Sequence, residues 1–212
     1  MIIANFKSNI VNFDRWAADF INSCPPVMFY VGMAPPSIYI TEYSRGIEYC
    51  SNGDDSDSYS LRMAIGAQDV DHSSGSRTGA ISIEMLDEIG VEFVIIGHSE
   101  RREFFHEDND LIRKKIQGVN ESKIGRTILC IGETKEENKM GATKDVLKNQ
   151  LSVIDGFELG ENFTIAYEPV WAIGSGQTPE PKEINEIHKY IKDVVQSVST
   201  NNHVPYVVYG GS

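Results

Sequence analysis

Seven short apolar segments, separated by segments of helical periodicity, constrain the fold of this chain most strongly. They are residues 1–4, 27–31, 63–67, 93–96, 126–131, 163–167 and 206–209. Most are apolar at nearly every position, whereas strands that face water on one side alternate between apolar and polar residues. The pattern therefore predicts seven strands of a parallel sheet that is covered on both faces.

Apolar residues recur every three or four positions between these segments, which is the periodicity of amphipathic helices. The stripes lie within residues 13–21, 85–89, 111–119, 147–154 and 184–198. Residues suited to helix starts are Ser82, Asp108 or Asn109, Pro179 and Pro181. Strands that alternate with helices predict an α/β fold of βαβ units in a single domain, residues 1–212. The pattern leaves open whether the sheet is doubly wound or closed into a barrel.

The charge of the chain excludes several classes of partner. With 31 acidic and 19 basic residues, its formal net charge is −12, which disfavours binding to nucleic acid and to anionic membranes. No apolar run approaches the ~20 residues of a membrane-spanning helix. The amino terminus lacks the charge order of a secretory signal, so we expect a cytoplasmic protein.

The cysteines and the aspartate-rich segment do not predict a metal site. Cys24, Cys50 and Cys130 are an odd number without CxxC spacing, which argues against a disulfide framework and a zinc site. Residues 53–60 lack the glycine and glutamate spacing of a calcium-binding loop. We therefore expect free thiols, an exposed loop at 53–60 and no bound metal.

Polar residues follow nearly every predicted strand. In parallel α/β proteins the carboxyl ends of the strands meet at one rim, where the chemistry takes place. The residues at these positions include Asn5, Lys7, Gln68, Asp69, His98, Glu100, Arg101, Arg102, Glu133 and Glu168. Each of them alone is more often structural, but their joint pattern predicts a site at this rim.

Glu168 carries more weight because of the loop that follows it. Residues 169–176 are apolar at the start and glycine-rich at the end, so Trp171, Ala172 and Ile173 must be buried against something. A lid that closes over a site and expels water would bury them. The alternative is a loop that is permanently docked on the rim.

Two glycine-rich stretches indicate a ligand. Residues 173–176 and 210–212 could bring backbone amides close to an oxyanion. Together with Lys7, a local positive charge in an acidic protein, they indicate a small phosphorylated metabolite.

Seven motifs in order along the chain carry a resemblance to a known family. They are Asn5-Phe6-Lys7-Ser8-Asn9, Ala34-Pro35-Pro36, Gly66-Ala67-Gln68-Asp69, Gly97-His98-Ser99-Glu100-Arg101-Arg102, Cys130-Ile131-Gly132-Glu133-Thr134, residues 166–176 and Tyr209-Gly210-Gly211-Ser212. With these motifs the chain resembles triosephosphate isomerase over essentially all of its 212 residues. The resemblance implies an eight-stranded (β/α) barrel, the TIM barrel, normally a homodimer. It also implies interconversion of dihydroxyacetone phosphate and D-glyceraldehyde 3-phosphate, in glycolysis and gluconeogenesis, without a cofactor.

The resemblance also implies roles for four residues at the strand ends. Glu168 matches the base that moves a proton between two carbons through an enediolate. His98 matches the neutral imidazole that polarises the carbonyl. Lys7 matches the cation that stabilises the oxyanion, and Asn5 matches a donor to the substrate oxygen. These roles are coherent because a carbon acid loses its proton readily only when the oxyanion is stabilised.

Further residues match the phosphate site and the dimer loop of the family. Gly174 and Ser212, with Ile173 and Gly211 beside them, are expected to hold the phosphate. Thr78 lies in a loop that resembles the one that inserts into the partner subunit.

The chain departs from the family's pattern in several places. Ala80 replaces a usual glutamate and Phe6 a common tryptophan, but neither change removes a catalytic group. Cys130 matches a family cysteine behind the base, where packing is its expected role. Family members continue beyond Ser212, so we expect the eighth strand and its flanking helices to be absent from this sequence.

Two other functions remain open at this point. One is another phosphosugar-binding barrel of the epimerase type, which the strand ends do not support because they lack a metal-ligand set. The other is a catalytically dead barrel fragment that serves as a binding module.

Overall fold

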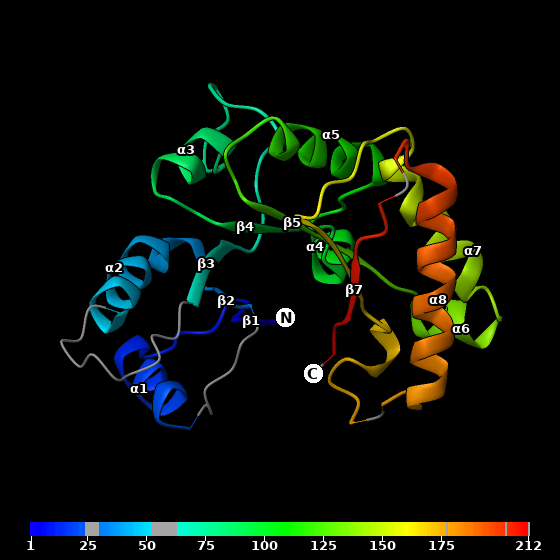
Figure 1. Ribbon diagram of the computed structural model, residues 1–212, viewed down its shortest axis with the longest axis horizontal. Coiled ribbons are helices and arrows are strands. Elements are labelled where there is room, and N and C mark those ends of the chain that lie inside the picture. Colours follow the sequence, from blue (N-terminus) through cyan, green and yellow to red (C-terminus); the bar gives the residue numbers. More distant parts are fainter. Residues whose placement is uncertain (24–29, 52–62, 177, 202, 212) are drawn as a thin grey trace.

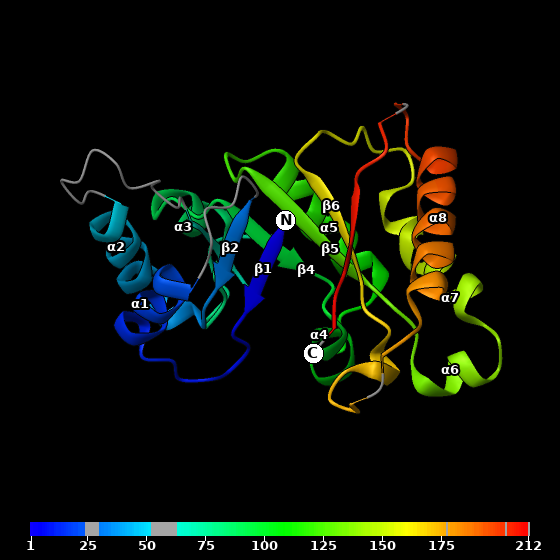
Figure 2. The same ribbon diagram turned by 60° about the horizontal axis from the view of Figure 1, so that its bottom comes forward.

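The computed structural model describes residues 1–23, 30–51, 63–176, 178–201 and 203–211. In this part of the chain, seven strands form one parallel sheet in the order β1 to β7. They are β1 (Ile2–Asn5), β2 (Val31–Ala34), β3 (Met63–Ala67), β4 (Phe93–Ile96), β5 (Arg126–Ile131), β6 (Phe163–Tyr167) and β7 (Tyr206–Tyr209). The sheet curls, and Figure 2 shows the edge strands β1 and β7 on the same side of the molecule. The fold class predicted from the sequence, a parallel α/β barrel architecture, is confirmed.

Most helices lie on the outer side of the curl (Figure 1). The α-helices are α1 (Phe13–Ser23), α2 (Ile40–Ser51), α3 (Ile83–Glu88), α4 (Ser99–Phe104), α5 (Asn109–Asn120), α6 (Lys135–Lys139), α7 (Thr143–Leu151) and α8 (Pro181–Val198). The short 3-10 helices are η1 (Ser37–Tyr39), η2 (Ser152–Ile154) and η3 (Val170–Ala172). Each of the strands β1 to β6 is thus followed by a segment that leads to the start of the next strand.

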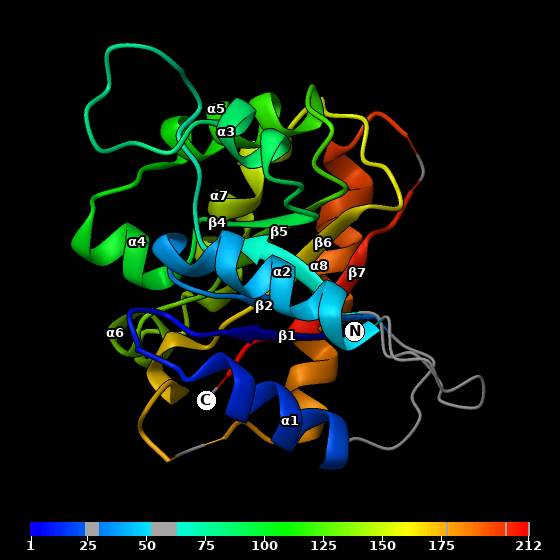
Figure 3. The same cartoon turned by 90° about the vertical axis from the view of Figure 1, so that its left-hand side faces the viewer.

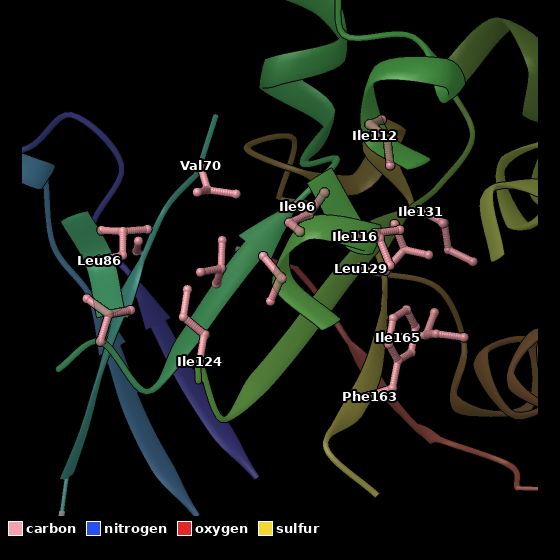
Figure 4. Packing of buried hydrophobic residues seen from close by; sticks show 14 of the residues in the cluster. Val70, Leu86, Ile96, Ile112, Ile116, Ile124, Leu129, Ile131, Phe163 and Ile165 are labelled. Carbon is pink, nitrogen blue, oxygen red and sulfur yellow. The ribbon is translucent and has the colours of Figure 1, made fainter. Parts of the chain in front are cut away.

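The sheet carries two apolar layers, because successive side chains of a strand point to opposite faces. The layer inside the curl consists of Ala34, Ala64, Phe93, Ile95, Ile128, Cys130 and Ala166. The outer layer packs the sheet against the helices, and Figure 4 shows Ile116 of α5 and Leu129 of β5 in it. Phe93 fills the interior so closely that a Cβ added to Gly66 would lie 2.2 Å from its ring.

Five of the seven predicted strands have the predicted bounds, and the first lies one residue further along the chain. The prediction for the second strand, residues 27–31, was wrong: β2 is Val31–Ala34, and residues 27–29 lie outside the described part. Val31 to Ala34 are all buried and pair with β1, and the first three of them also pair with β3, whereas hydrophobicity alone favoured the preceding run. Pro35, which lacks a backbone N–H, follows the last strand residue.

The predicted helix starts are largely confirmed. Ser82 and Asp108 cap α3 and α5, and Pro181 is the first residue of α8. The stripe predicted for α3 was partly wrong, because Met85 and Ile89 are exposed. α3 has only six residues, and of these only Ile83 and Leu86 are buried.

Some sequence predictions fall on residues that the structure describes only in part. Cys130 is a free, buried thiol, while the side chains of Cys24 and Cys50 and the loop at 53–60 lie outside the described residues. None of the helices in the described ranges has the length and apolar character needed to cross a lipid bilayer.

Candidate active site

Glu168 lies at the rim formed by the carboxyl ends of the strands. It directly follows β6, and its backbone N–H donates to the carbonyl of Ile131 at 2.7 Å, which continues the pairing with β5. The residue is buried, and its Oε2 accepts a hydrogen bond from the N–H of Ser99 at 3.3 Å. Burial and the nearby Glu168 carboxylate raise the pKa of the Cys130 thiol well above its usual value, so this neighbour remains neutral.

His98 lies beside this carboxylate at the end of β4. Its Nε2 is 3.3 Å from Glu168 Oε1, and the ring is buried. Its Nδ1 accepts a hydrogen bond from the backbone N–H of Glu100 at 3.2 Å, because His98 is the N-cap of α4. A neutral imidazole that accepts at Nδ1 carries its proton on Nε2. The donor side of the ring thus faces the site.

Lys7 and Asn5 come from another part of the rim: Asn5 is the last residue of β1, and Lys7 lies two residues beyond it. Lys7 has a left-handed backbone with φ 51, a conformation that costs a non-glycine residue about 1–2 kcal/mol. Two side-chain amides hold this turn: Asn5 Oδ1 accepts from the Lys7 N–H at 3.0 Å, and Gln68 Nε2 donates to the Lys7 carbonyl at 2.8 Å. The ammonium pairs with Glu100 Oε1 at 2.8 Å, next to the turn that carries His98.

These four residues border one cavity of about 480 Å³. Its polar end contains Asn5, Lys7, His98 and Glu168, and its apolar wall contains Ile3, Ile95, Ile128, Ala166 and Val208. The structure therefore brings together all four residues that the sequence predicts to be catalytic. A small polar molecule bound here would meet a carboxylate, an imidazole and an ammonium group at once.

The residues predicted to hold a phosphate are only partly gathered at this cavity. Ile173 and Gly211 line it. Gly174 is exposed and is not among its lining residues, and Ser212 lies outside the described residues. Thr78 is exposed on the loop before α3 and does not border the cavity.

The loop after Glu168 is anchored by a buried carboxylate. Glu133, which follows β5, is fully buried and accepts from Trp171 Nε1 at 2.8 Å, from Tyr167 OH at 3.2 Å and from Asn138 Nδ2 at 3.1 Å. Burial and the Glu133 charge raise the pKa of Tyr167, so this hydroxyl remains a donor. Trp171 belongs to η3 and fixes the start of the loop on the rim.

Asp69, another strand-end residue, belongs to a separate, partly buried ion cluster. Its carboxylate pairs with Lys115 at 2.6 Å and with Arg101 at 2.8 Å, and both cations also contact Glu107 at 2.6 Å. Burial raises the pKa of Asp69 although the two cations oppose that effect. Two cations and two carboxylates compensate one another, which indicates a structural role.

The contacts that hold the site in place were not predicted from the sequence. Glu133 was noted at a strand end, but its partners come from β6, η3 and α6. Gln150 of α7 holds both backbone groups of Gly132, and no local pattern marks it. The one available signal was the capping box of α6, Thr134 with Glu137, which places a helix start directly after Glu133.

The fold and the site together define a class of protein. It is a parallel (β/α) barrel protein in which a buried carboxylate, an imidazole and an ammonium group line one cavity at the carboxyl ends of the strands. This set of side chains suits proton transfer on a small anionic metabolite. Within the described ranges, no group of three or more metal-ligating side chains is present.

Comparison with known proteins identifies the family. The family model described as triosephosphate isomerase matches residues 1–212. Proteins named triosephosphate isomerase from Escherichia coli (strain K12 / DH10B) and from Shigella boydii serotype 18 are each 38% identical to this chain over 187 residues. The alignments cover 86% of this chain and 69% of each relative. The chain belongs to the triosephosphate isomerase family.

Proposed function

We propose that this chain interconverts dihydroxyacetone phosphate and D-glyceraldehyde 3-phosphate, a step of glycolysis and gluconeogenesis. The observation that carries the proposal is the placement of Glu168 and His98, 3.3 Å apart, in the cavity that Lys7 and Asn5 also line. Family membership supports the same reaction. A glycolytic role also fits the cytoplasmic location expected from the sequence.

In the proposed mechanism, the carboxylate of Glu168 removes a proton from the carbon next to the substrate carbonyl and returns it to the neighbouring carbon. The Nε2–H of His98 gives its proton to the carbonyl oxygen and the imidazole takes up the proton of the adjacent substrate hydroxyl, so that the carbonyl and the hydroxyl exchange places. The Lys7 ammonium stabilises the negative charge that develops on these oxygens. Asn5 donates to the same region. These roles are physically consistent, because the enediolate forms only where hydrogen-bond donors are already in place to stabilise its negative charge.

The phosphate of the substrate is proposed to bind next to Lys7, at the glycine-rich segments that include Ile173, Gly174, Gly211 and Ser212. Backbone N–H groups suit an oxyanion, and Lys7 supplies a positive charge. The loop that begins at Trp171 would close over the bound substrate and exclude water from the enediolate.

The test is an isomerase assay on the purified protein and on Glu168→Gln. The substitution keeps the shape of the side chain but removes the base, so turnover should fall by about three orders of magnitude while the circular dichroism spectrum remains unchanged. Glu186→Gln, at an exposed position of α8, is the matched control and should retain full activity. Unchanged turnover in Glu168→Gln would contradict the mechanism.

The alternative functions make different predictions in the same assay. An epimerase-type barrel or a binding module would turn over neither triose phosphate, even as the unmodified protein. Nothing in the described structure favours either of them.

We also propose that the chain forms a homodimer. Large apolar side chains are exposed on loops and short helices: Ile10, Ile38, Met85, Phe104 and Phe105. Phe105 lines a second cavity of about 500 Å³, together with Gly79 and Ala80 of the loop before α3. Figure 3 shows the loop after β1, the loop before α3 and helix α4 along one side of the molecule. Exposed apolar groups gathered in this way are typical of a protein–protein interface. The loop that carries Thr78 lies at this surface.

Sedimentation of the purified protein tests the dimer. Phe104→Asp places a charge in the proposed interface and should shift the protein towards the monomer. Met140→Asp, at an equally exposed apolar position next to α6, should leave the mass in solution unchanged. A monomeric unmodified protein would contradict the proposal.

A further inference from the structure

Helix α7 reaches the backbone beside Glu168 through a single side chain. The amide of Gln150 accepts from the N–H of Gly132 at 2.8 Å and donates to the carbonyl of Gly132 at 3.0 Å. Gly132 lies just past the end of β5, so its backbone groups need partners outside the strand ladder. One carboxamide satisfies both of them and fixes Gly132 in two directions.

Gly132 in turn determines where the backbone of Glu168 lies. A Cβ added to Gly132 would be 1.7 Å from the carbonyl oxygen of Glu168, so the two backbones are in direct contact. A shift of Gly132 would therefore displace Glu168 or open a gap behind it. The two hydrogen bonds of Gln150 thus act on Glu168, the proposed base, through Gly132.

A second chain of contacts runs from the neighbouring residue of α7 to His98. The backbone carbonyl of Asn149 accepts from Asn109 Nδ2 at 2.9 Å. Asn109 Oδ1 accepts from Arg102 Nη1 at 2.9 Å, and Arg102 Nε donates to the carbonyl of Gly97 at 3.0 Å. Gly97 directly precedes His98 in the turn after β4.

From these contacts we propose that Gln150, Asn109 and Arg102 form a brace between α7 and the site that sets the spacing of His98 and Glu168. Its two arms begin at adjacent residues of α7. They end on the backbone next to His98 and Glu168, the two side chains that are proposed to transfer protons. All three are positioning residues, because they act through Gly97 and Gly132 and do not border the cavity. The proposal rests on the proposed isomerase function and names further residues that this function requires.

Kinetics of variants of both arms provide the first test. A misplacement of about 1 Å can lower the rate of a proton transfer by about 100-fold. Gln150→Ala and Asn109→Leu should therefore lower kcat about 10- to 100-fold and change KM less than about threefold. Gln150→Glu keeps the acceptor for the Gly132 N–H but loses the donor, and its loss should be smaller. If Gln150→Ala fails to fold, this variant carries the test of that arm.

Asn149→Ala is the matched control. Asn149 contributes only its backbone carbonyl to the brace, so removal of its exposed side chain should leave kcat unchanged. A loss of activity in this control as large as that in Gln150→Ala would contradict the brace, because it would show that any change in this part of α7 is harmful.

Combination with Glu168→Gln distinguishes positioning from general damage. If Gln150 acts through Glu168, the second substitution should lower the residual kcat of Glu168→Gln less than about twofold. A full additional 10- to 100-fold loss would overturn the proposal, since the effect would then be independent of the base.

A measurement without substrate separates this proposal from the proposed function. The ¹⁵N signals of the His98 imidazole should show protonated Nε2 and unprotonated Nδ1 in the unmodified protein and in Asn149→Ala. In Asn109→Leu they should show a mixture of tautomers. In parallel, exchange of the Gly132 amide hydrogen should accelerate at least about tenfold in Gln150→Ala. If the protein is not an isomerase, the assay fails while these changes persist; if the brace is wrong, the signals and the exchange rate stay unchanged.

Discussion

The two halves of the site differ in how the fold holds them. His98 and Glu168 follow β4 and β6, which have partners on both sides, and the two residues are only 6% and 7% exposed. Asn5 is the last residue of β1, which lies at one edge of the sheet in the described part of the chain, and Lys7 follows it. The side chain of Lys7 is 33% exposed. The ammonium is tied to Glu100, whose side chain is 41% exposed.

This difference shows that the two halves of the site are held in place by different kinds of interaction. The inner half depends on buried groups that satisfy one another, so its loss should appear in stability as well as in activity. The edge half depends on a local turn and an exposed ion pair, which contribute little to stability. Substitutions in the two halves should therefore have different signatures.

The largest effect on the edge half is expected from Lys7→Met. It removes the positive charge next to the developing oxyanion, and the loss of one such group typically lowers kcat by about 10²- to 10³-fold. Because the ion pair with Glu100 is exposed, the free energy of unfolding should change by no more than about 1 kcal/mol. Steady-state kinetics and urea unfolding of the same preparation measure both quantities.

Glu100→Gln is the control for this comparison, since it removes the ion pair but leaves the ammonium in place. The kcat of Glu100→Gln should be close to that of the unmodified protein, whereas the kcat of Lys7→Met should be much lower. Equal losses in the two variants would mean that the ion pair, and not the charge of Lys7, is what the reaction needs.

The sequence predicts the strands of the sheet better than the helices that cover it. Strands β3 to β6 were predicted with their observed bounds because nearly all of their residues are buried, so that the apolar run and the strand coincide. β7 also has its predicted bounds, although its residues are exposed or only partly buried. Helices α4 and α6 have no buried residue and hence no apolar stripe to recognise. α2 was also missed, since only Ile40 and Tyr43 of its described side chains are buried.

The site could be predicted as far as its residues lie directly after strands. Glu168, His98 and Lys7 lie one or two residues after a strand, and Asn5 is the last residue of β1. Parallel topology brings such positions together. The groups that hold them cannot be found in this way, because a residue such as Gln150 reaches Gly132 from a helix 18 positions further along the chain. Its pairing depends on tertiary packing and leaves no local pattern.

In the inner half, Trp171→Phe should lower stability. The indole N–H donates to the fully buried Glu133 at 2.8 Å, and its removal leaves a buried carboxylate with fewer donors. Hydrogen bonds to buried charged groups typically contribute about 1.5–3 kcal/mol, so the free energy of unfolding should fall by about that amount. Trp16→Phe is the matched control: its ring stacks on Phe20, and no hydrogen bond of its indole is present in the described part of the chain. An equal loss in both variants would assign the effect to packing alone.

The smallest effect, and the finest test of the inner half, concerns His188 of α8. Its ring meets the ring of Tyr167 edge-on at 6.2 Å, and burial, together with the positive charge of Lys192, lowers its pKa below the usual 6.5. The folded state therefore binds this proton more weakly than the unfolded chain does. The stabilising contribution of neutral His188 is complete above pH 6.5 and is lost as the pH falls through that value towards the lower pKa of the folded state. Urea unfolding at pH 7.5 and 5.5 should show a smaller decrease in stability for His188→Gln than for the unmodified protein. An equal decrease in the two proteins would mean that the packing of α8 against Tyr167 does not depend on the charge state of His188.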